Sequence, residues 1–210
     1  MTFLWGAVSC CMIQYPTITS EVDPEAFIYV FNKLDGSNIR AEWSRKRGGF
    51  WKFGAKTRLL DSHDPVLGEA PGLAKAGFER QLDGIFRGMR LERAVAFFEF
   101  FGPNSFAGSH VAEPHKVVLI DVATEKGMLP PDKFIRHFDG VEHASMLATG
   151  CAIPKFVEAV RNREVERMTF EGVVCKSLDS PLMFKIKSRA WLAKLKQHCG
   201  GDDKMFRRLA

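Results

Sequence analysis

The chain has 210 residues, of which 46% are hydrophobic and 26% are charged. That balance is typical of a globular domain with one well-filled core, and it excludes disorder as the default state. No apolar run approaches the ~18 residues of a membrane helix, and the opening ten residues lack the basic start of a signal peptide, so we expect neither a membrane segment nor secretion. Five cysteines without a CxxC spacing, including the adjacent Cys10 and Cys11, indicate reduced thiols in the cytoplasm and no disulfide framework.

The order of apolar runs and turn signals predicts an α+β fold. We expect strands at 26–33, 94–102, 116–123, 170–177 and 182–188, a hairpin within 39–58 that turns at Gly48 and Gly49, and helices at 73–90, 130–138, 154–168 and 189–199. Because strands outweigh regular strand–helix alternation, the sheets should be mainly antiparallel and flanked by helices. We interpret residues 1–25 as an N-terminal extension and 26–210 as a single domain ending in a short basic helix or tail.

The basic residues gather in two blocks. From Lys33 to Arg58 there are eight lysines and arginines against two acidic residues, and from Lys185 to the end there are again eight against two. Such blocks suit a polyanionic partner, either nucleotide phosphates or a nucleic acid, although a solvated surface is the alternative interpretation.

Three segments carry residues that could do chemistry. The sequence KLDGSN places Lys33 at the end of an apolar strand and before a tight turn, where a ligand can approach the backbone closely. Such a lysine becomes a nucleophile when desolvation or nearby cations lower its pKa, yet a lysine before a turn is also a common structural feature.

The second segment, AFFEFFG, places Glu99 on a strand among four phenylalanines. On a strand this carboxylate shares a face with Phe97 and Phe101. Burial there is costly unless the carboxylate pairs with a cation, binds a metal or meets a hydroxylated ligand. A structural ion pair is the alternative.

The third segment is the expected hairpin formed by FEGVVCKS and LMFKIKS. Folded about Asp179 and Ser180, it would bring Glu171 roughly opposite Lys187, and Lys185 would point to the same face as Lys187. Two lysines beside a carboxylate suit a triphosphate and its metal ion.

In this order, KLDGSN, FFEFFG, EGVVCK and KIK resemble the covalent nucleotidyltransferase superfamily of polynucleotide ligases and capping enzymes. Asn38, where capping enzymes and DNA ligases usually have arginine, favours the ATP-dependent RNA ligase branch of phages and bacteria. The resemblance covers roughly residues 26–192. It implies the adenylyltransferase fold, a lysyl–AMP intermediate, and the joining of a 5′-phosphate to a 3′-hydroxyl.

The resemblance also implies roles for individual residues. Lys33 would carry the AMP, Glu99 would hold the ribose, and Glu171 would engage Mg²⁺ or Mn²⁺. Lys185 and Lys187 would contact the α-phosphate and, with the metal, lower the pKa of Lys33. The further residues expected at the nucleotide are Asn32, Leu34, Asp35, Asn38, Lys56 and Arg58.

Two departures from the family pattern stand out. Leu119 or Ile120 stands where the family often has an aromatic residue that stacks on adenine. Only 23 residues follow Lys187, too few for an OB-fold of ~70 residues, so we expect the domain to hold RNA, in a nicked duplex or an RNA/DNA hybrid, with its own basic surface as a monomer. The alternatives are a DNA nick ligase, a capping-type guanylyltransferase, and a non-catalytic RNA-binding module with the same fold.

Overall fold

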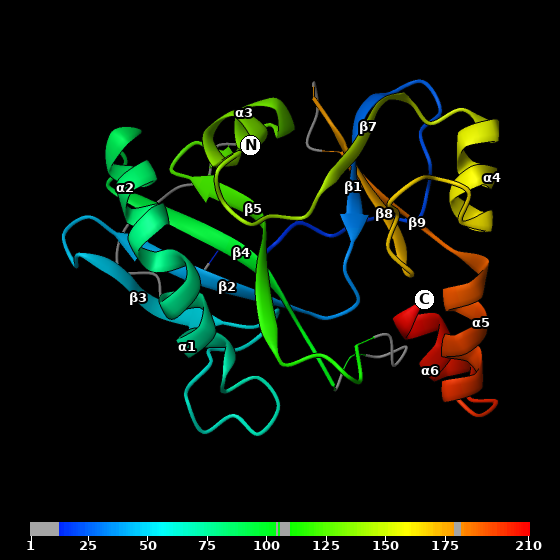
Figure 1. The fold of residues 1–210 in the computed structure, drawn as a ribbon, viewed down its shortest axis with the longest axis horizontal. Coiled ribbons are helices and arrows are strands. Elements are labelled where there is room, and N and C mark those ends of the chain that lie inside the picture. The colour runs from blue at the N-terminus through cyan, green and yellow to red at the C-terminus, as the bar shows by residue number, and fades with distance from the viewer. Residues whose placement is uncertain (1–12, 104, 106–109, 179–181) are drawn as a thin grey trace. The chain divides into compact units, whose positions relative to one another are not determined.

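The computed structural model describes residues 13–103, 105, 110–178 and 182–210 (Figure 1). The chain forms two compact units, each assembled from separate stretches of sequence. Unit 1 comprises residues 1–16, 36–102 and 113–143, and unit 2 comprises residues 17–35, 103–112 and 144–210. Within the described part of the chain, no helix is both long and apolar enough to cross a membrane.

Unit 1 contains an antiparallel five-stranded sheet in the order β3-β2-β4-β5-β6. Its strands are β2 (Ser37–Ser44), β3 (Gly49–Gly54), β4 (Arg93–Phe101), β5 (Lys116–Thr124) and β6 (Gly127–Met128). Its helical segments are α1 (Ala70–Ala74), a π-helical turn η1 (Lys75–Glu79), α2 (Arg80–Gly88) and α3 (Pro131–Phe138).

Aromatic packing joins the helices of unit 1 to one face of its sheet. The ring of Trp43 on β2 lies 5.2 Å from that of Phe86 on α2, and Phe98 on β4 lies 5.0 Å from Phe78 on η1, measured between ring centroids. Leu82 and Phe86 lie one helical turn apart on α2, and both are buried. The opposite face carries polar side chains such as Asn38 and Glu42 together with a smaller apolar cluster of Val95, Phe97 and Ala123.

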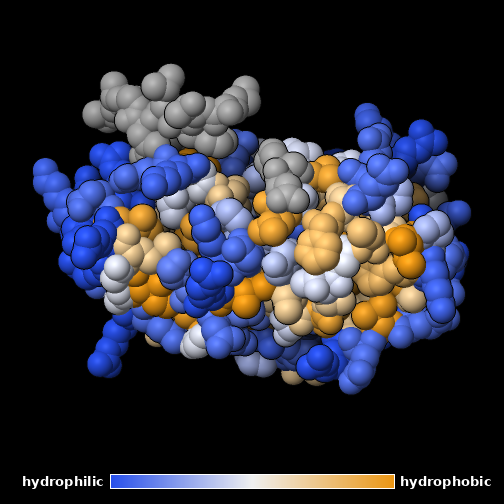
Figure 2. All heavy atoms as spheres, turned by 90° about the horizontal axis from the view of Figure 1, so that it is seen from above, coloured by the Kyte–Doolittle hydropathy of each residue, from blue (hydrophilic) through white to orange (hydrophobic). Residues whose placement is uncertain are grey.

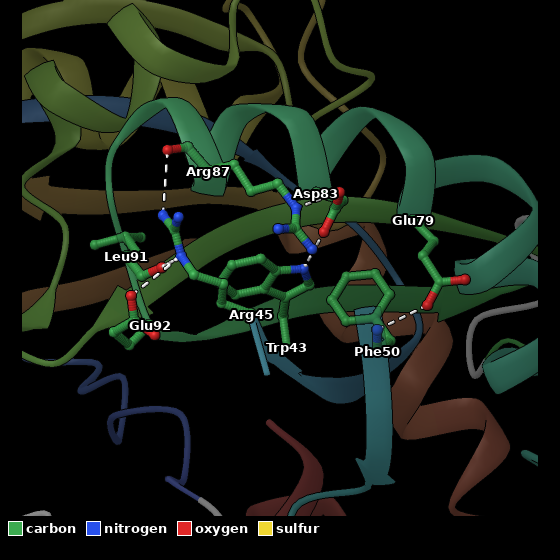
Figure 3. A network of polar contacts seen from close by, with 8 residues as sticks. All are labelled: Trp43, Arg45, Phe50, Glu79, Asp83, Arg87, Leu91 and Glu92. Atoms are coloured by element: carbon green, nitrogen blue, oxygen red, sulfur yellow. Dashed lines mark hydrogen bonds and ion pairs between the residues drawn. The ribbon is translucent and has the colours of Figure 1, made fainter. Parts of the chain in front are cut away.

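Polar contacts fix the β2–β3 hairpin to η1, to helix α2 and to the turn that follows α2 (Figure 3). The indole N–H of Trp43 donates to Asp83 over 2.9 Å, and the Arg45 guanidinium donates to the Leu91 carbonyl over 2.9 Å. The backbone N–H of Phe50 donates to the Glu79 carboxylate over 2.7 Å. Both strands of the hairpin, β2 and β3, are therefore hydrogen-bonded to the helical segments.

Unit 2 contains a four-stranded antiparallel sheet in the order β7-β1-β8-β9. Its strands are β1 (Phe27–Lys33), β7 (Met146–Cys151), β8 (Gly172–Ser177) and β9 (Met183–Lys187), and its helices are α4 (Pro154–Asn162), α5 (Arg189–His198) and α6 (Asp203–Leu209). The buried side chains of Ile28, Val160 and Phe184 lie in its core. A second apolar cluster packs α5 against α6.

The α+β class with antiparallel sheets flanked by helices is confirmed. Three details differ from the sequence-based expectation. The helix expected at 154–168 ends at Asn162, because Arg163 adopts a left-handed conformation with φ of 65°. Strands β6 and β7 were not expected. The basic end of the chain, expected as a short helix or tail, forms a second helix, α6, after α5. The turn expected at Asp179 and Ser180 lies outside the described residues, as do Cys10 and Cys11.

Candidate active site

Three neighbouring strands of unit 2 bring two lysines to one row of the sheet. Lys33 is the last residue of β1, and its register partner on β8 is Gly172. Gly172 in turn pairs with Lys187 on β9. The two lysines therefore flank a residue that has no side chain.

Gly172 is required at this position. Its φ is +138°, a conformation that side-chain-bearing residues rarely adopt, and a Cβ atom there would overlap the carbonyl oxygen of Ile186. We expected Glu171 opposite Lys187, but Gly172 holds that register position and Glu171 lies just before the strand. The sequence pattern does not determine a register to one residue when the turn is uncertain.

The carboxylate of Glu171 nevertheless lies between the two lysines. Its Oε1 atom is 3.0 Å from Nζ of Lys33 and 3.2 Å from Nζ of Lys187. Glu171 is 3% exposed, and a carboxylate buried to this extent is stable only when cations or hydrogen-bond donors compensate it. Lys33, Glu171 and Lys187 thus form one charge cluster around a buried carboxylate.

Lys187 has two further contacts. Its ammonium donates to the carbonyl oxygen of Leu209 on α6 over 2.9 Å and lies 3.9 Å from the ring centroid of Trp191 on α5. Burial lowers the pKa of Lys187 to about 8, with the positive charges of Lys33 and Lys185 acting in the same direction and Glu171 opposing them. This is the kind of perturbed group that occurs at functional sites.

Lys185 lies two residues before Lys187 on β9, on the same face of the strand, and is half-buried. Its backbone N–H donates to the carbonyl of Thr19 over 2.9 Å, which joins the segment before β1 to the sheet edge. The expected pairing of Lys185 and Lys187 on one face therefore agrees with the register of β9.

The loop before β8 supports the end of β1, a role that the sequence analysis missed. The Thr169 hydroxyl oxygen lies 2.5 Å from the Lys33 carbonyl oxygen, and the Thr169 backbone N–H donates to the Asn32 side chain over 2.8 Å. The Asn32 amide donates to the Arg167 carbonyl over 3.1 Å. Asn32 therefore fixes the loop that leads to Glu171.

Ser188 was missed in the same way. It is fully buried, and its hydroxyl donates to the Phe170 carbonyl over 2.7 Å and accepts from the Trp191 backbone N–H at the start of α5. Its own backbone N–H donates to the Glu171 carbonyl over 2.9 Å. A serine directly after a strand and before a helical pattern is the N-cap signal that could have revealed it.

The KLDG segment links the two units. Leu34 is half-buried and Asp35 is buried at the end of a stretch of unit 2. Gly36 begins the next stretch of unit 1, where a Cβ atom would overlap the Phe100 carbonyl oxygen. The glycine of this motif is needed for close backbone approach to β4.

In unit 1, Asn38 on β2 and Glu99 on β4 are direct register partners. Glu99 is half-buried, and it shares its face of the sheet with Phe97. Tyr15, which the sequence analysis missed, packs its ring at 5.0 Å from that of Phe97 and donates its hydroxyl to Asp121 over 2.8 Å. Burial and the negative charges of Asp121 and Glu99 raise the pKa of Tyr15.

The positions where the family often has an aromatic residue lie on β5. Leu119 is fully buried. Ile120 lies at a shift of register between β4 and β5 and packs in the same cluster as Tyr15. An aromatic side chain is therefore present beside Ile120, although it comes from the segment before β1.

Lys56 and Arg58 lie on the exposed segment after β3. Arg58 forms an ion pair and hydrogen bond with Asp64, which lowers the pKa of the Asp64 carboxyl to about 2. The structure thus gathers Lys33, Glu171 and Lys187 in one cluster in unit 2 and pairs Asn38 with Glu99 in unit 1. Its Arg58 side chain has an acidic partner of its own.

Among the described residues, no group of three or more His, Cys, Asp or Glu side chains could hold a metal ion alone. Glu171 supplies a hard carboxylate oxygen of the kind that Mg²⁺ and Mn²⁺ bind. That oxygen contacts two ammonium groups, so a cation could bind it once another anion attracts the lysines.

Solved structures of RNA ligases share this fold. A Naegleria gruberi RNA ligase variant without ligand matches with a TM-score of 0.60 and 17% sequence identity over 88% of this chain and 60% of that one. The same ligase with pyrophosphate matches with a TM-score of 0.59 and 18% identity over the same shares, and a variant with ATP and Mn matches with 0.59 and 16% over 82% and 51%.

This chain spans a little more than half the length of those ligases. No protein-family model matches the sequence, and no curated protein matches it. At identities of 16–18% the likeness establishes the fold, which is that of the nucleotidyltransferase domain of RNA ligases.

Proposed function

We propose that this chain is an ATP-dependent RNA ligase of the phage and bacterial type, acting in the cytoplasm as a monomer. The observation that carries the proposal is the cluster in which Lys33 and Lys187 contact the same carboxylate oxygen of Glu171. The resemblance identifies these as the nucleophile, a phosphate-binding lysine and the metal-binding glutamate. The fold shared with solved RNA ligases supports the proposal.

In the first step, the Lys33 amine attacks the α-phosphorus of ATP. A nitrogen–phosphorus bond forms, the bond from the α-phosphorus to the pyrophosphate oxygen breaks, and the amine loses its proton. Phosphoryl transfer depends mainly on positioning and on neutralising charge, so cationic groups are needed around the phosphates. Lys185 and Lys187 supply two of them, while Glu99 and Asn38 are assigned to the ribose and its surroundings.

The triphosphate also changes the partners of the cluster. Its oxygens compete with Glu171 for the Lys187 ammonium, which leaves the carboxylate able to accept a cation. The positive charges of Lys185, Lys187 and that cation favour the neutral amine of Lys33, which is the form that attacks phosphorus. A bound Mg²⁺ or Mn²⁺ would neutralise phosphate charge, with Glu171 as its protein ligand.

In the second and third steps, a 5′-phosphate of the polynucleotide takes the AMP from Lys33, and a 3′-hydroxyl then displaces AMP to form a phosphodiester. Each step exchanges one phosphorus bond for another and needs no further energy source. The basic segments beyond the cluster are assigned to the polynucleotide.

Two assays test the proposal. Incubation with α-labelled ATP followed by a denaturing gel should leave covalent label on the protein, whereas a non-catalytic RNA-binding module would leave none. Sealing of nicked and single-stranded RNA and DNA, with ATP and GTP compared, distinguishes RNA ligase from DNA nick ligase or guanylyltransferase. A chain that labels with GTP but not with ATP would contradict the proposal.

A further inference from the structure

Hydrophobic residues lie among hydrophilic ones on the face drawn in Figure 2. Trp51 on β3 is a large aromatic side chain at the surface, 42% exposed. Its indole is accompanied by cations. The guanidinium carbon of Arg47 lies 4.2 Å from the ring centroid, and Nζ of Lys52 lies 5.6 Å from it. An exposed indole among cations is the combination that single-stranded nucleic acids bind, since bases stack on the ring and phosphates meet the charges.

A shift in strand register explains why this tryptophan is exposed. Glu42 pairs with Lys52, whereas the next residue, Trp43, pairs with Phe50, so Trp51 is an extra residue in β3. Bulges of this kind re-aim a side chain and recur beside functional sites. Here the bulge leaves the neighbouring Phe50 buried in the core and Trp51 at the surface.

The hairpin that carries Trp51 is held rigidly. Trp43, Arg45 and Phe50 are bonded to α2, to the turn after it and to η1, respectively, by the contacts described above (Figure 3). A platform fixed in this way loses little conformational freedom when a ligand stacks on it.

Strand register relates the platform to the face of the sheet that lies opposite the helices. Along β2, Asn38, Arg40 and Glu42 alternate onto one face, and Glu42 pairs with Lys52. Asn38 pairs with Glu99 on that same face. Between Trp51 and these two residues, Arg40 is buried and donates to the Ile13 carbonyl, and Tyr15 packs against Phe97. The segment before β1 therefore covers the middle of this face, and a base stacked on Trp51 binds at the hairpin end of it.

Charges around the hairpin favour a polyanion. Lys46 and Arg47 are exposed at its tip. Two nearby acidic side chains have cationic partners, with Glu42 at 3.8 Å from Lys52 and Glu92 at 3.1 Å from Arg45, and Glu79 accepts from the Phe50 backbone N–H. The tip is therefore positive, which complements phosphates.

We propose that Trp51 is a stacking platform for a base of a single-stranded polynucleotide. The base replaces the Arg47 guanidinium on the indole, and Arg47 and Lys46 then bind the adjoining phosphates. The proposal rests on the proposed function for the expectation that this polynucleotide is RNA.

The test is binding of a fluorescently labelled single-stranded RNA oligonucleotide, followed by anisotropy across a salt series. Trp51→Ala should weaken binding roughly five- to a hundred-fold, the range found for loss of one base–aromatic stack. Trp51→Phe, which keeps an aromatic face, should recover part of that loss. Because stacking releases no counterions, the slope of log affinity against log salt should stay unchanged in both variants.

Phe27→Ala is the matched control, since Phe27 is an aromatic residue on a strand with 46% exposure. It should bind RNA as the wild type does. Three results would each contradict stacking on Trp51. They are wild-type RNA affinity in Trp51→Ala, an equal loss of affinity in Phe27→Ala, and a reduced salt slope in Trp51→Ala. If RNA binding depends on Trp51 but the chain forms no lysyl–AMP, the proposed ligase function is wrong and the proposed stacking on Trp51 is supported.

Discussion

The ammonium of Lys187 lies 3.9 Å from the ring centroid of Trp191, on the first turn of the helix that follows its strand. The indole buries this lysine while facing it with the electron-rich surface of an aromatic ring. Burial lowers the pKa of Lys187 from 10.5 to about 8, and the neighbouring Glu171 carboxylate acts in the opposite direction by favouring the charged form.

That pKa predicts a pH dependence. Lys187 must be charged to bind phosphate, so kcat/KM for ATP in self-adenylylation should fall as pH rises through about 8. Lys187→Arg keeps its charge at every accessible pH and should move the fall to higher pH, even if the rate is reduced. If kcat/KM of the arginine variant falls at the same pH as that of the wild type, the titrating group is a residue other than Lys187.

The same pKa has a consequence for folding. The folded chain releases the Lys187 proton more readily than the unfolded chain, whose lysine titrates near 10.5. Keeping this lysine charged therefore costs stability below pH 8, and the cost disappears between about 8 and 10.5. Denaturant titrations of the wild type and Lys187→Met across that window should show a wild-type contribution that rises with pH.

Glu171 predicts a dependence on metal. Glu171→Ala should abolish adenylylation, because it removes the carboxylate assigned to the metal and leaves two half-buried ammonium groups without their shared anion. Glu171→Asp should keep a fraction of the activity and need more Mg²⁺ or Mn²⁺ to reach it. Titrating the metal while measuring covalent labelling by ATP checks this. Full labelling of the alanine variant at ordinary Mg²⁺ would mean that Glu171 serves only as an ion-pair partner of the lysines.

Gly172 predicts a stability effect. Gly172→Ala forces a side chain into a φ of +138° and against the Ile186 carbonyl, so unfolding free energy should fall by roughly 2 kcal/mol or more. Gly84→Ala, on helix α2 with open space around its Cβ position, should instead gain about 0.5–1 kcal/mol. Urea unfolding of both variants provides the comparison, and equal effects would contradict the register described for β8 and β9.

The hairpin tip predicts a separation of steps. Replacing Lys46 and Arg47 by alanine should weaken sealing more than self-adenylylation, because they are assigned to polynucleotide phosphates. Each lost phosphate contact should reduce the salt slope of RNA binding by about 0.7. Salt titrations of adenylylation and of sealing, run side by side, measure this. Identical salt sensitivity of the two steps would contradict the assignment of the hairpin tip to RNA binding.

Much of the fold could be predicted because alternation and turn residues are local signals. The hairpin turning near Gly48 and the apolar strands around Glu99 and before Lys33 came from such signals. Strand β7, with the sequence MLATGC, has little alternation of apolar and polar residues, and its pairing with β1 decides its conformation.

Only the charged residues of the candidate site could be predicted from the sequence. Lys33, Glu171 and Lys187 stand out by type and order along the chain. Thr169 contacts Lys33, which is far from it in sequence, and Trp191 lies on a helix that packs back on the Lys187 strand. The residue types of Thr169 and Trp191 alone do not indicate these contacts. The two compact units were also not expected, because each collects separate stretches of the chain.

The central claim is that Lys33 becomes covalently adenylylated. After incubation with ATP and Mg²⁺, intact-mass analysis should show the addition of one AMP, and tandem mass spectrometry should place it on Lys33. Lys33→Ala should lose the added mass while keeping its fold, and Lys155→Ala, which removes an exposed lysine of α4, should keep it. AMP on any other lysine, or an unmodified wild-type chain under these conditions, would contradict the account.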